Sequence, residues 1–260
     1  MNLKEKVRDI LRPYYYALIK GKTQRQVKST VRELKKYKNK YMGKRCFVIG
    51  NGPSLRVKDL DKIQANGDIS FGCNRIYVLF DKTSWRPTFY ISQDPNVIRG
   101  CIEEIRELDK DQVKFIKALG KRKYEVEGAI YFDFVIRFGK KKLPKFSDNP
   151  EKALYNGYTV TYAAIQFAAY MGFNEIYLLG CDCSYSPDNQ SIQTISQESY
   201  PDARMYNPAK VGMPPDIAYM FSMYEICKDY CEKRGIKVFN ATRGGKLEVF
   251  DRVNFDSLMQ

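Results

Sequence analysis

From Arg45 onward, short apolar runs alternate with longer segments of helical periodicity. Runs of mainly apolar residues that suit buried strands occupy residues 46–49, 68–71, 88–92, 113–116, 129–132, 175–179 and 236–239. Helices are expected over residues 55–63, 159–171 and 215–233, and the second of these is apolar nearly all round, as a buried helix would be. This alternation indicates an α/β, Rossmann-like fold: a mostly parallel sheet with helices on both faces.

The first 43 residues have a different pattern, and we expect a basic helical arm (1–43) ahead of a Rossmann-like nucleotide-sugar-binding domain (44–260). Apolar residues recur at helical spacing over residues 3–14, where Pro13 should kink or end the helix. A second helical stretch is expected over residues 23–40. The arm has thirteen Lys and Arg against three acidic residues, so it carries +10 of the net charge of +14.

A basic arm with an apolar, tyrosine-bearing face has two interpretations. It suits an anionic membrane surface, or it packs on its own domain or on a sister subunit of a homo-oligomer. Nucleic acid is not an expected partner, because no recognised nucleic-acid-binding module follows the arm.

Composition narrows the chemistry. The chain contains no histidine, which excludes Ser-His-Asp and Cys-His mechanisms and argues against a zinc site. Its seven cysteines form no Cys-x-x-Cys pair, which indicates buried, reduced thiols rather than a disulfide framework. No apolar run approaches the ~20 residues of a membrane span, and no secretory signal opens the chain. We therefore expect a cytoplasmic protein, peripheral on the inner face of the membrane if the arm binds lipid.

Polar side chains collect where the predicted strands end. Ligands of open parallel sheets bind outside the carboxyl ends of the strands, so these side chains are candidates for a binding site. They are Asn51, Ser54, Asn74, Gln93, Asp94, Asp182, Asn240 and Thr242.

The turn Gly50-Asn51-Gly52-Pro53-Ser54 follows the first predicted strand. Its two glycines allow a sharp turn and a close approach to a ligand, and Pro53 suits the entry to a helix whose free N–H groups face the turn. Ser54 would cap that helix or bind a phosphate. The run is neither a Walker loop nor a GxGxxG fingerprint, so a plain strand-to-helix turn is the competing interpretation.

The other candidates also have two interpretations each. Asn74 and Asp94 would bind a base or ribose, or would stabilise their loops as Asx turns. Thr159 opens the buried helix either as a simple N-cap or as part of an anion site. Asp182 is a site carboxylate or a solvent-facing strand end, and residues 184–213, which include Tyr185, Tyr200 and Tyr206, form a lid or a disordered loop.

Three motifs in this order resemble known families. They are Gly-Asn-Gly-Pro-Ser-Leu at residue 50, Cys-Asn-Arg-Ile-Tyr at residue 73, and Gly-Phe-Asn-Glu-Ile-Tyr-Leu-Leu-Gly-Cys-Asp at residue 172. Over residues 44–250 the chain resembles the bacterial sialyltransferases of glycosyltransferase family 42. It also resembles the wider 6-hydroxymethylpterin diphosphokinase-like group of surface-polysaccharide (capsule and lipopolysaccharide) clusters, to which the run at residues 240–247 is more similar.

The resemblance implies a metal-independent transferase without a cofactor, which uses a CMP-linked sugar as its donor substrate. It implies contacts of Asn51 and Gly52 with phosphate or ribose, and of Asn74 and Asp94 with the donor. Residues 159–161 correspond to the Thr-Ser-Gly of the sialyltransferases, with Val160 in place of serine and Thr161 in place of glycine.

The catalytic groups depart from that pattern. The sialyltransferases use a histidine base and two tyrosines that hold the leaving phosphate, whereas this chain has no histidine. Tyr185 lies one residue beyond the position of the first tyrosine, and Asp182 or Asp216 would have to replace the base.

Three functions follow from these observations. The leading hypothesis is a glycosyltransferase that moves a sugar from a nucleotide donor to a surface-glycan or lipid-linked acceptor. The alternatives are a pterin pyrophosphokinase-like enzyme, which would need ATP and magnesium, and a catalytically inactive nucleotide-binding scaffold in glycan assembly.

Overall fold

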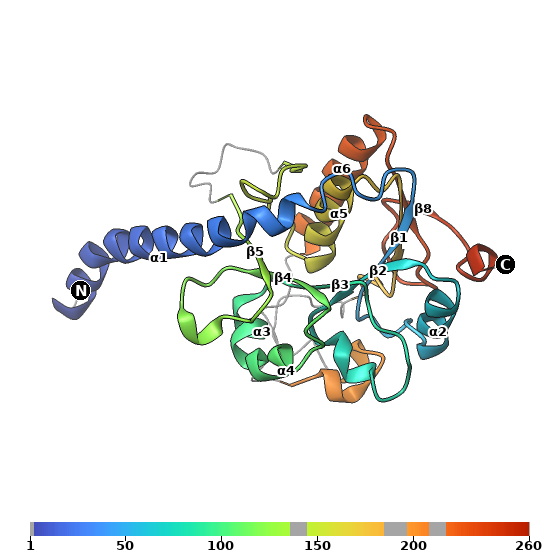
Figure 1. The fold of residues 1–260 in the computed structure, drawn as a ribbon, viewed down its shortest axis with the longest axis horizontal. Coiled ribbons are helices and arrows are strands. Elements are labelled where there is room, and N and C mark those ends of the chain that lie inside the picture. The colour runs from blue at the N-terminus through green and yellow to red at the C-terminus, as the bar shows by residue number, and fades with distance from the viewer. Residues whose placement is uncertain (1–2, 136–144, 185–196, 208–216, 260) are drawn as a thin grey trace.

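The computed structural model describes residues 3–135, 145–184, 197–207 and 217–259, with the side chains of the first helix described from Ile19 onward. Within these residues the chain forms one layered α/β unit around a single sheet (Figure 1).

The sheet has eight strands in the order β5-β4-β3-β2-β1-β6-β7-β8, and every neighbouring pair is parallel. The strands are β1 (Arg45–Ile49), β2 (Ile69–Cys73), β3 (Phe89–Ser92), β4 (Val113–Lys117), β5 (Ile130–Phe132), β6 (Glu175–Leu179), β7 (Lys237–Asn240) and β8 (Asp251–Arg252). The seven predicted strands are therefore confirmed. The pattern did not predict β8, because it has only two residues and both are exposed.

Helices cover both faces of the sheet, as predicted (Figure 1). One hydrophobic core lies under α5 (Val160–Met171) and α6 (Ile217–Glu232). The other lies under α2 (Val57–Ala65), α3 (Pro95–Gly100) and α4 (Ile102–Arg106). Short 3-10 helices complete the chain: η1 (Asn74–Leu79), η2 (Arg122–Tyr124), η4 (Gln197–Ser199), η5 (Ala203–Met205) and η6 (Asp256–Met259).

The N-terminal arm is one long helix, α1 (Leu3–Lys35), which continues through Pro13 rather than ending there. Its first half projects away from the sheet, and its second half covers the edge strand β5 (Figure 1). Thr30 Oγ1 accepts a hydrogen bond from the Tyr131 backbone N–H at 2.9 Å, so a side chain of α1 satisfies a backbone donor of the edge strand. Leu34 of the same helix is fully buried. The part of the arm from Ile19 onward thus packs on its own domain, while its membrane role and the division of the chain at residue 43 stay predictions.

Two predictions from composition can be compared with the described residues. All seven cysteines are buried and none of them forms a disulfide bond, as predicted. None of the described helices is both long and apolar enough to cross a membrane.

Candidate functional site

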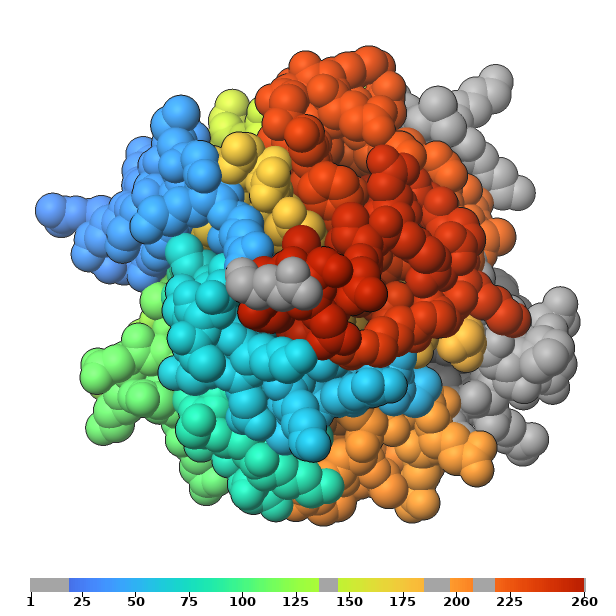
Figure 2. Space-filling model, turned by 90° about the vertical axis from the view of Figure 1, so that its right-hand side faces the viewer, coloured from blue at the N-terminus to red at the C-terminus, as the bar shows by residue number. Residues whose placement is uncertain are grey.

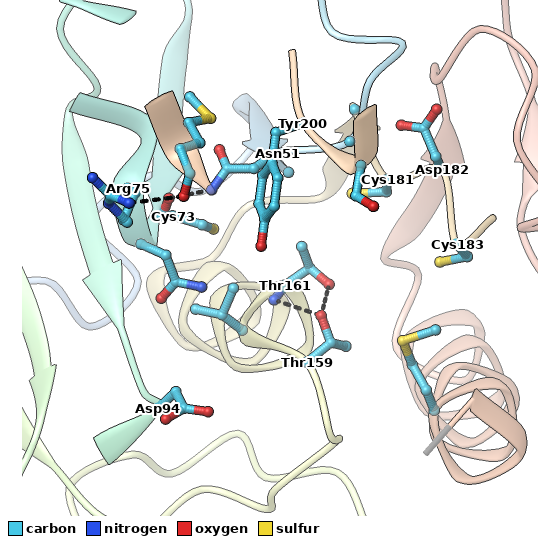
Figure 3. Close-up of a pocket in the computed structure, with 18 of the residues that line it drawn as sticks. Asn51, Cys73, Arg75, Asp94, Thr159, Thr161, Cys181, Asp182, Cys183 and Tyr200 are labelled. Carbon is cyan, nitrogen blue, oxygen red and sulfur yellow. Dashed lines mark hydrogen bonds between the residues drawn. The ribbon is translucent and has the colours of Figure 1, made fainter. Parts of the chain in front are cut away.

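A cavity of about 240 Å³ opens at the carboxyl edge of the sheet. It lies where β1 neighbours both β2 and β6, so the chain leaves the sheet in opposite directions on either side of it. The structure brings together eleven predicted site residues in its lining: Gly50, Asn51, Gly52, Pro53, Asn74, Gln93, Asp94, Thr159, Val160, Thr161 and Asp182. These residues come from four strand ends and one helix N-terminus, and only the fold places them side by side (Figure 3).

The glycines of the first turn line the cavity and also pack against the end of β6. Gly52 donates its backbone N–H to the carbonyl oxygen of Gly180 at 2.8 Å. A Cβ atom at Gly50 would overlap the Gly180 carbonyl oxygen and lie 2.9 Å from its carbon. A Cβ atom at Gly52 would overlap the carboxylate of Asp182. The two glycines are therefore needed for the close approach of β1 and β6, which was not the role predicted for them.

The helix after this turn begins later than predicted. Its first residue is Val57, its N-cap residue is Arg56, and no side chain caps it. Ser54 instead donates its hydroxyl to Asp182 Oδ2 at 2.8 Å and its backbone N–H to Asp182 Oδ1 at 3.2 Å. The prediction that Ser54 caps the helix was therefore wrong, because a carboxylate 128 residues away holds this serine.

Asp182 is buried, and its carboxylate points away from the middle of the cavity (Figure 3). Burial raises its pKa above the ordinary value, while the two hydrogen bonds from Ser54 oppose that rise. With both oxygens engaged by Ser54, this carboxylate is placed to hold the turn against β6. The geometry favours this positioning role over the predicted proton transfer.

The helix N-terminus that faces the cavity belongs to α5. Thr159 is its N-cap residue, and its hydroxyl accepts a hydrogen bond from the Thr161 backbone N–H at 3.4 Å. The Thr161 hydroxyl is hydrogen-bonded both to the Thr159 hydroxyl, at 2.9 Å, and to the Tyr224 hydroxyl. The N-cap interpretation of Thr159 is therefore confirmed. It is compatible with an anion site, because the N-terminus of this twelve-residue helix carries the positive end of the helix dipole.

Two amide oxygens in the cavity lining accept no hydrogen bond from any residue that the structure describes. Asn51 donates its Nδ2 group to the Cys73 carbonyl at 2.9 Å, but its Oδ1 atom is buried and, among the described residues, accepts no hydrogen bond. Gln93 Oε1 is also buried and accepts no hydrogen bond among the described residues. A buried acceptor without a donor costs about 1–3 kcal/mol, so both oxygens would gain from a ligand that carries hydroxyl or amino groups.

Two further strand-end side chains of the lining, those of Asn74 and Asp94, are hydrogen-bonded within the protein. Asn74 has a left-handed backbone conformation (φ 50°), and its Oδ1 atom accepts a hydrogen bond from the Ser92 hydroxyl at 3.2 Å. Asp94 caps α3 and accepts hydrogen bonds from the backbone N–H groups of Asn96 and Val97. The loop-stabilising interpretation holds for Asp94, although both residues also line the cavity.

Tyr200 reaches the cavity from a segment that lies far away in sequence. Its hydroxyl points toward the middle of the cavity (Figure 3). Burial raises the pKa of this hydroxyl, and the charge of Arg75 opposes the rise, so Tyr200 stays protonated and can donate a hydrogen bond. The sequence places Tyr200 in the expected lid, but nothing in its surroundings distinguishes it from Tyr206.

Residues 197–207 are fixed to the segment after β2. Arg75 Nη1 donates to the Met205 carbonyl at 2.9 Å, and Arg204 pairs with Asp81 at 2.7 Å. Lys82 pairs with Asp202 at 2.7 Å. In the space-filling view this segment, drawn in orange, lies against the turquoise surface that follows β2 (Figure 2). This part of the expected lid is therefore ordered, and charge pairs hold it over the cavity.

Cysteines also line the cavity, although they were not predicted site residues. Burial raises the pKa of the Cys181 thiol well above its usual value and that of Cys183 to about 12. Both thiols are thus protonated and poorly nucleophilic. Two of the predicted catalytic residues, Tyr185 and Asp216, lie outside the described residues.

Comparison with known proteins identifies both a family and a fold. The family described as 6-hydroxymethylpterin diphosphokinase MptE-like matches residues 22–188. This match begins within α1, earlier than the predicted start of the resemblance at residue 44. A search of curated proteins by sequence finds no match.

Two solved structures match this chain, and the first of them is similar to it in fold. The MAf glycosyltransferase from Magnetospirillum magneticum AMB-1 superposes with a TM-score of 0.53 at 18% identity, over 90% of this chain. The match covers 39% of the MAf chain, so this chain spans well under half of that protein. A mammalian sialyltransferase, solved with Gal-beta-1-3GalNAc-ortho-nitrophenol, gives a TM-score of 0.38 at 12% identity, over 84% of this chain and 79% of that one.

Proposed function

This chain belongs to the 6-hydroxymethylpterin diphosphokinase MptE-like family, and we propose that, within this family, it is a glycosyltransferase. It would move a sugar from a nucleotide-activated donor, for which we propose a CMP-linked sugar, to a surface-glycan or lipid-linked acceptor. The glycosyltransferase-like fold, shared with MAf, is compatible with this activity.

One observation carries the proposal: a helix N-terminus and two unpaired buried amide oxygens face the same cavity. The N-terminus of α5 lines the cavity and places the positive end of its dipole where a phosphate would bind. Asn51 Oδ1 and Gln93 Oε1 offer acceptors to the hydroxyl or amino groups of a nucleoside or a sugar. A phosphate joined to a hydroxyl-rich group would suit both the helix N-terminus and the two amide oxygens. A nucleotide-activated sugar provides this combination.

Side chains around the phosphate position would assist departure of the nucleotide. Tyr200 has a protonated hydroxyl directed into the cavity, and it would donate a hydrogen bond to the phosphate as negative charge develops there. Arg75 adds positive charge to the lining. No general base is assigned, because Asp182 is held by Ser54.

A pterin pyrophosphokinase is the second candidate, because the family description names that activity. Such an enzyme would need carboxylates to hold magnesium. The carboxylates in the described lining are Asp94, which caps α3, and Asp182, which binds Ser54. Because both carboxylates already accept hydrogen bonds from the protein, the lining favours a glycosyltransferase over an enzyme that must hold magnesium.

A thermal-shift panel of nucleotides, each with and without magnesium, tests the proposal. We expect cytidine nucleotides to stabilise the protein without magnesium, by about 2.7 kcal/mol when the ligand is at a hundred times its Kd. Stabilisation only by ATP with magnesium would instead identify the pyrophosphokinase, and no response to any nucleotide would favour a scaffold.

The variant Asn51→Asp tests whether the nucleotide occupies this cavity. The new carboxylate cannot donate to the Cys73 carbonyl as Asn51 Nδ2 does, and it adds negative charge to a cavity proposed to hold a phosphate. Both effects should together cost about 2 kcal/mol of binding free energy, equivalent to an approximately 30-fold higher Kd in isothermal titration. Asn174→Asp is the matched control, because Asn174 is exposed just before β6 begins, at the opposite edge of the sheet. Equal affinities of the two variants would place the ligand elsewhere.

The basic arm suggests a second part of the proposal, namely attachment to an anionic membrane surface. Exposed Lys20, Lys22 and Lys28 lie along α1 next to its projecting half. Each lysine near such a surface contributes about 1 kcal/mol. A surface-glycan acceptor carried on a lipid would then be within reach of the cavity.

Vesicle binding checks the role of the arm. Replacing Lys20, Lys22 and Lys28 by Gln should weaken binding to phosphatidylglycerol vesicles about 100-fold in a flotation assay. The matched control replaces by Gln the exposed residues Lys233, Arg234 and Lys237, which lie from the end of α6 to the start of β7, away from the arm. If both triple variants bind vesicles as the wild type does, the membrane role of the arm is refuted.

A further inference from the structure

Two exposed tyrosines form a stacked pair at the rim of the cavity. The described residues expose three large hydrophobic side chains: Met42, Tyr158 and Tyr219, with 71%, 45% and 53% of their surface accessible. The rings of Tyr158 and Tyr219 lie 5.3 Å apart at an interplanar angle of 27°. Tyr158 lines the cavity, and Tyr219 lies on α6 beside the lining residue Met220. Met42 precedes β1, at the opposite edge of the sheet.

The surroundings of Tyr158 hold its backbone in an unfavourable conformation. Its backbone is left-handed (φ 60°), a conformation that costs a non-glycine residue about 1–3 kcal/mol. Its N–H group donates to Asn156 Oδ1 at 3.0 Å, and the next residue, Thr159, begins the cap of α5. A Cβ atom at Gly157 would overlap the ring of Tyr162, so the chain before Tyr158 is closely packed as well. The fold thus holds a large apolar ring in solvent at the mouth of the cavity.

The chemistry of this pair suits a sugar ring. A pyranose has a face of C–H groups that packs on an aromatic ring, and its hydroxyls extend outward at the edges. Tyrosine supplies a large, rigid apolar face with a hydroxyl at its rim, and it loses little conformational freedom on binding. The unpaired polar atoms that would hold a nucleotide are buried at the strand ends, whereas this pair is exposed at the rim.

We propose that Tyr158 and Tyr219 form the acceptor platform, on which a pyranose ring of the acceptor glycan stacks. The name acceptor rests on the glycosyltransferase activity proposed above. The stacking of a sugar on these rings does not depend on it.

The probe is an array of immobilised oligosaccharides, followed by titration of the glycan that the wild type retains most strongly. Tyr158→Ala and Tyr219→Ala should each weaken that binding about tenfold or more. Tyr158→Phe should retain it, because the ring face is kept. Met42→Ala is the control, since it removes the exposed hydrophobic side chain away from the cavity and should have no effect.

Nucleotide affinity is measured on the same variants and separates the outcomes. Loss of glycan binding with unchanged nucleotide affinity supports the platform. If the alanine variants lose glycan binding and neither the wild type nor any variant binds a nucleotide, the platform is still supported. Only the proposed transferase activity is then refuted. An equal loss of nucleotide affinity would show that the rings stack on a base instead. That result would overturn the proposal. So would failure of the array to retain any glycan, and so would wild-type glycan binding by the two alanine variants.

Discussion

Removal of residues 1–43 is expected to leave a chain that does not fold, although the sequence alone presents these residues as a detachable arm. The second half of the arm contributes Leu34, which is fully buried, and Val27, which is 5% exposed. Tyr41 stacks on Phe173 with ring centroids 4.9 Å apart. Loss of one buried leucine side chain typically costs about 2–5 kcal/mol, and the whole stability of a domain is about 5–15 kcal/mol. Loss of these contacts together should therefore exceed the stability of the domain.

The matched truncation removes residues 1–18 only and should leave the unfolding transition of the domain nearly unchanged. It keeps Thr30, whose hydroxyl accepts from Tyr131 N, and Gln26, whose Oε1 atom accepts from Gly120 N at 3.1 Å. Circular dichroism and thermal melts of both truncations measure the difference. A cooperative melt at the wild-type temperature after removal of residues 1–43 would show that the arm is a separate unit.

Gly50→Ala should destabilise the protein and weaken nucleotide binding together. The added Cβ atom would overlap the Gly180 carbonyl and lie 3.0 Å from Cys181 Sγ, so the ends of β1 and β6 would have to separate. Overpacking of this kind costs about 3 kcal/mol, which lowers the Tm of a protein of this size by about 10 °C. The cavity lies directly above these strand ends, so a shift of the turn would also displace Asn51.

Gly21→Ala is the control for Gly50→Ala. Gly21 lies within α1, and a Cβ atom there would have no neighbour within 4 Å. Alanine within a helix is favoured over glycine by about 1 kcal/mol, so this variant should be slightly more stable than the wild type. The two substitutions are chemically identical and should shift the Tm in opposite directions. A Gly50→Ala variant as stable as the wild type would contradict the close approach of β1 and β6.

The family assignment and the site geometry lead to the same region of the chain. The family match ends at residue 188, just after β6, so it includes the turn at Gly50, the end of β2, the cap of α5 and Asp182. The segment that holds Tyr200 and the helix that holds Tyr219 lie beyond the match. The residues that we propose for the leaving phosphate and for the acceptor are therefore outside the matched region.

The sequence alone determined the α/β order of this protein. Parallel strands are covered on both faces, so each reads as an apolar run that ends in polar or glycine residues, and these runs predicted β1 to β7. Because the carboxyl ends of parallel strands share one edge, the sequence also indicated that Asn51, Gln93 and Asp182 belong to one site.

The tertiary structure alone decided how the individual side chains of that site are used. Local pattern suggested that Ser54 caps a helix, but Asp182 binds it from 128 residues away. Tyr200 enters the cavity because Arg75 holds the Met205 carbonyl 130 residues further along the chain. Hydrophobic periodicity reports which face of an element is buried, whereas a hydrogen bond between distant segments depends on where the fold brings them. The position of the site and its local caps could thus be predicted from the sequence, whereas the contacts between distant segments could not.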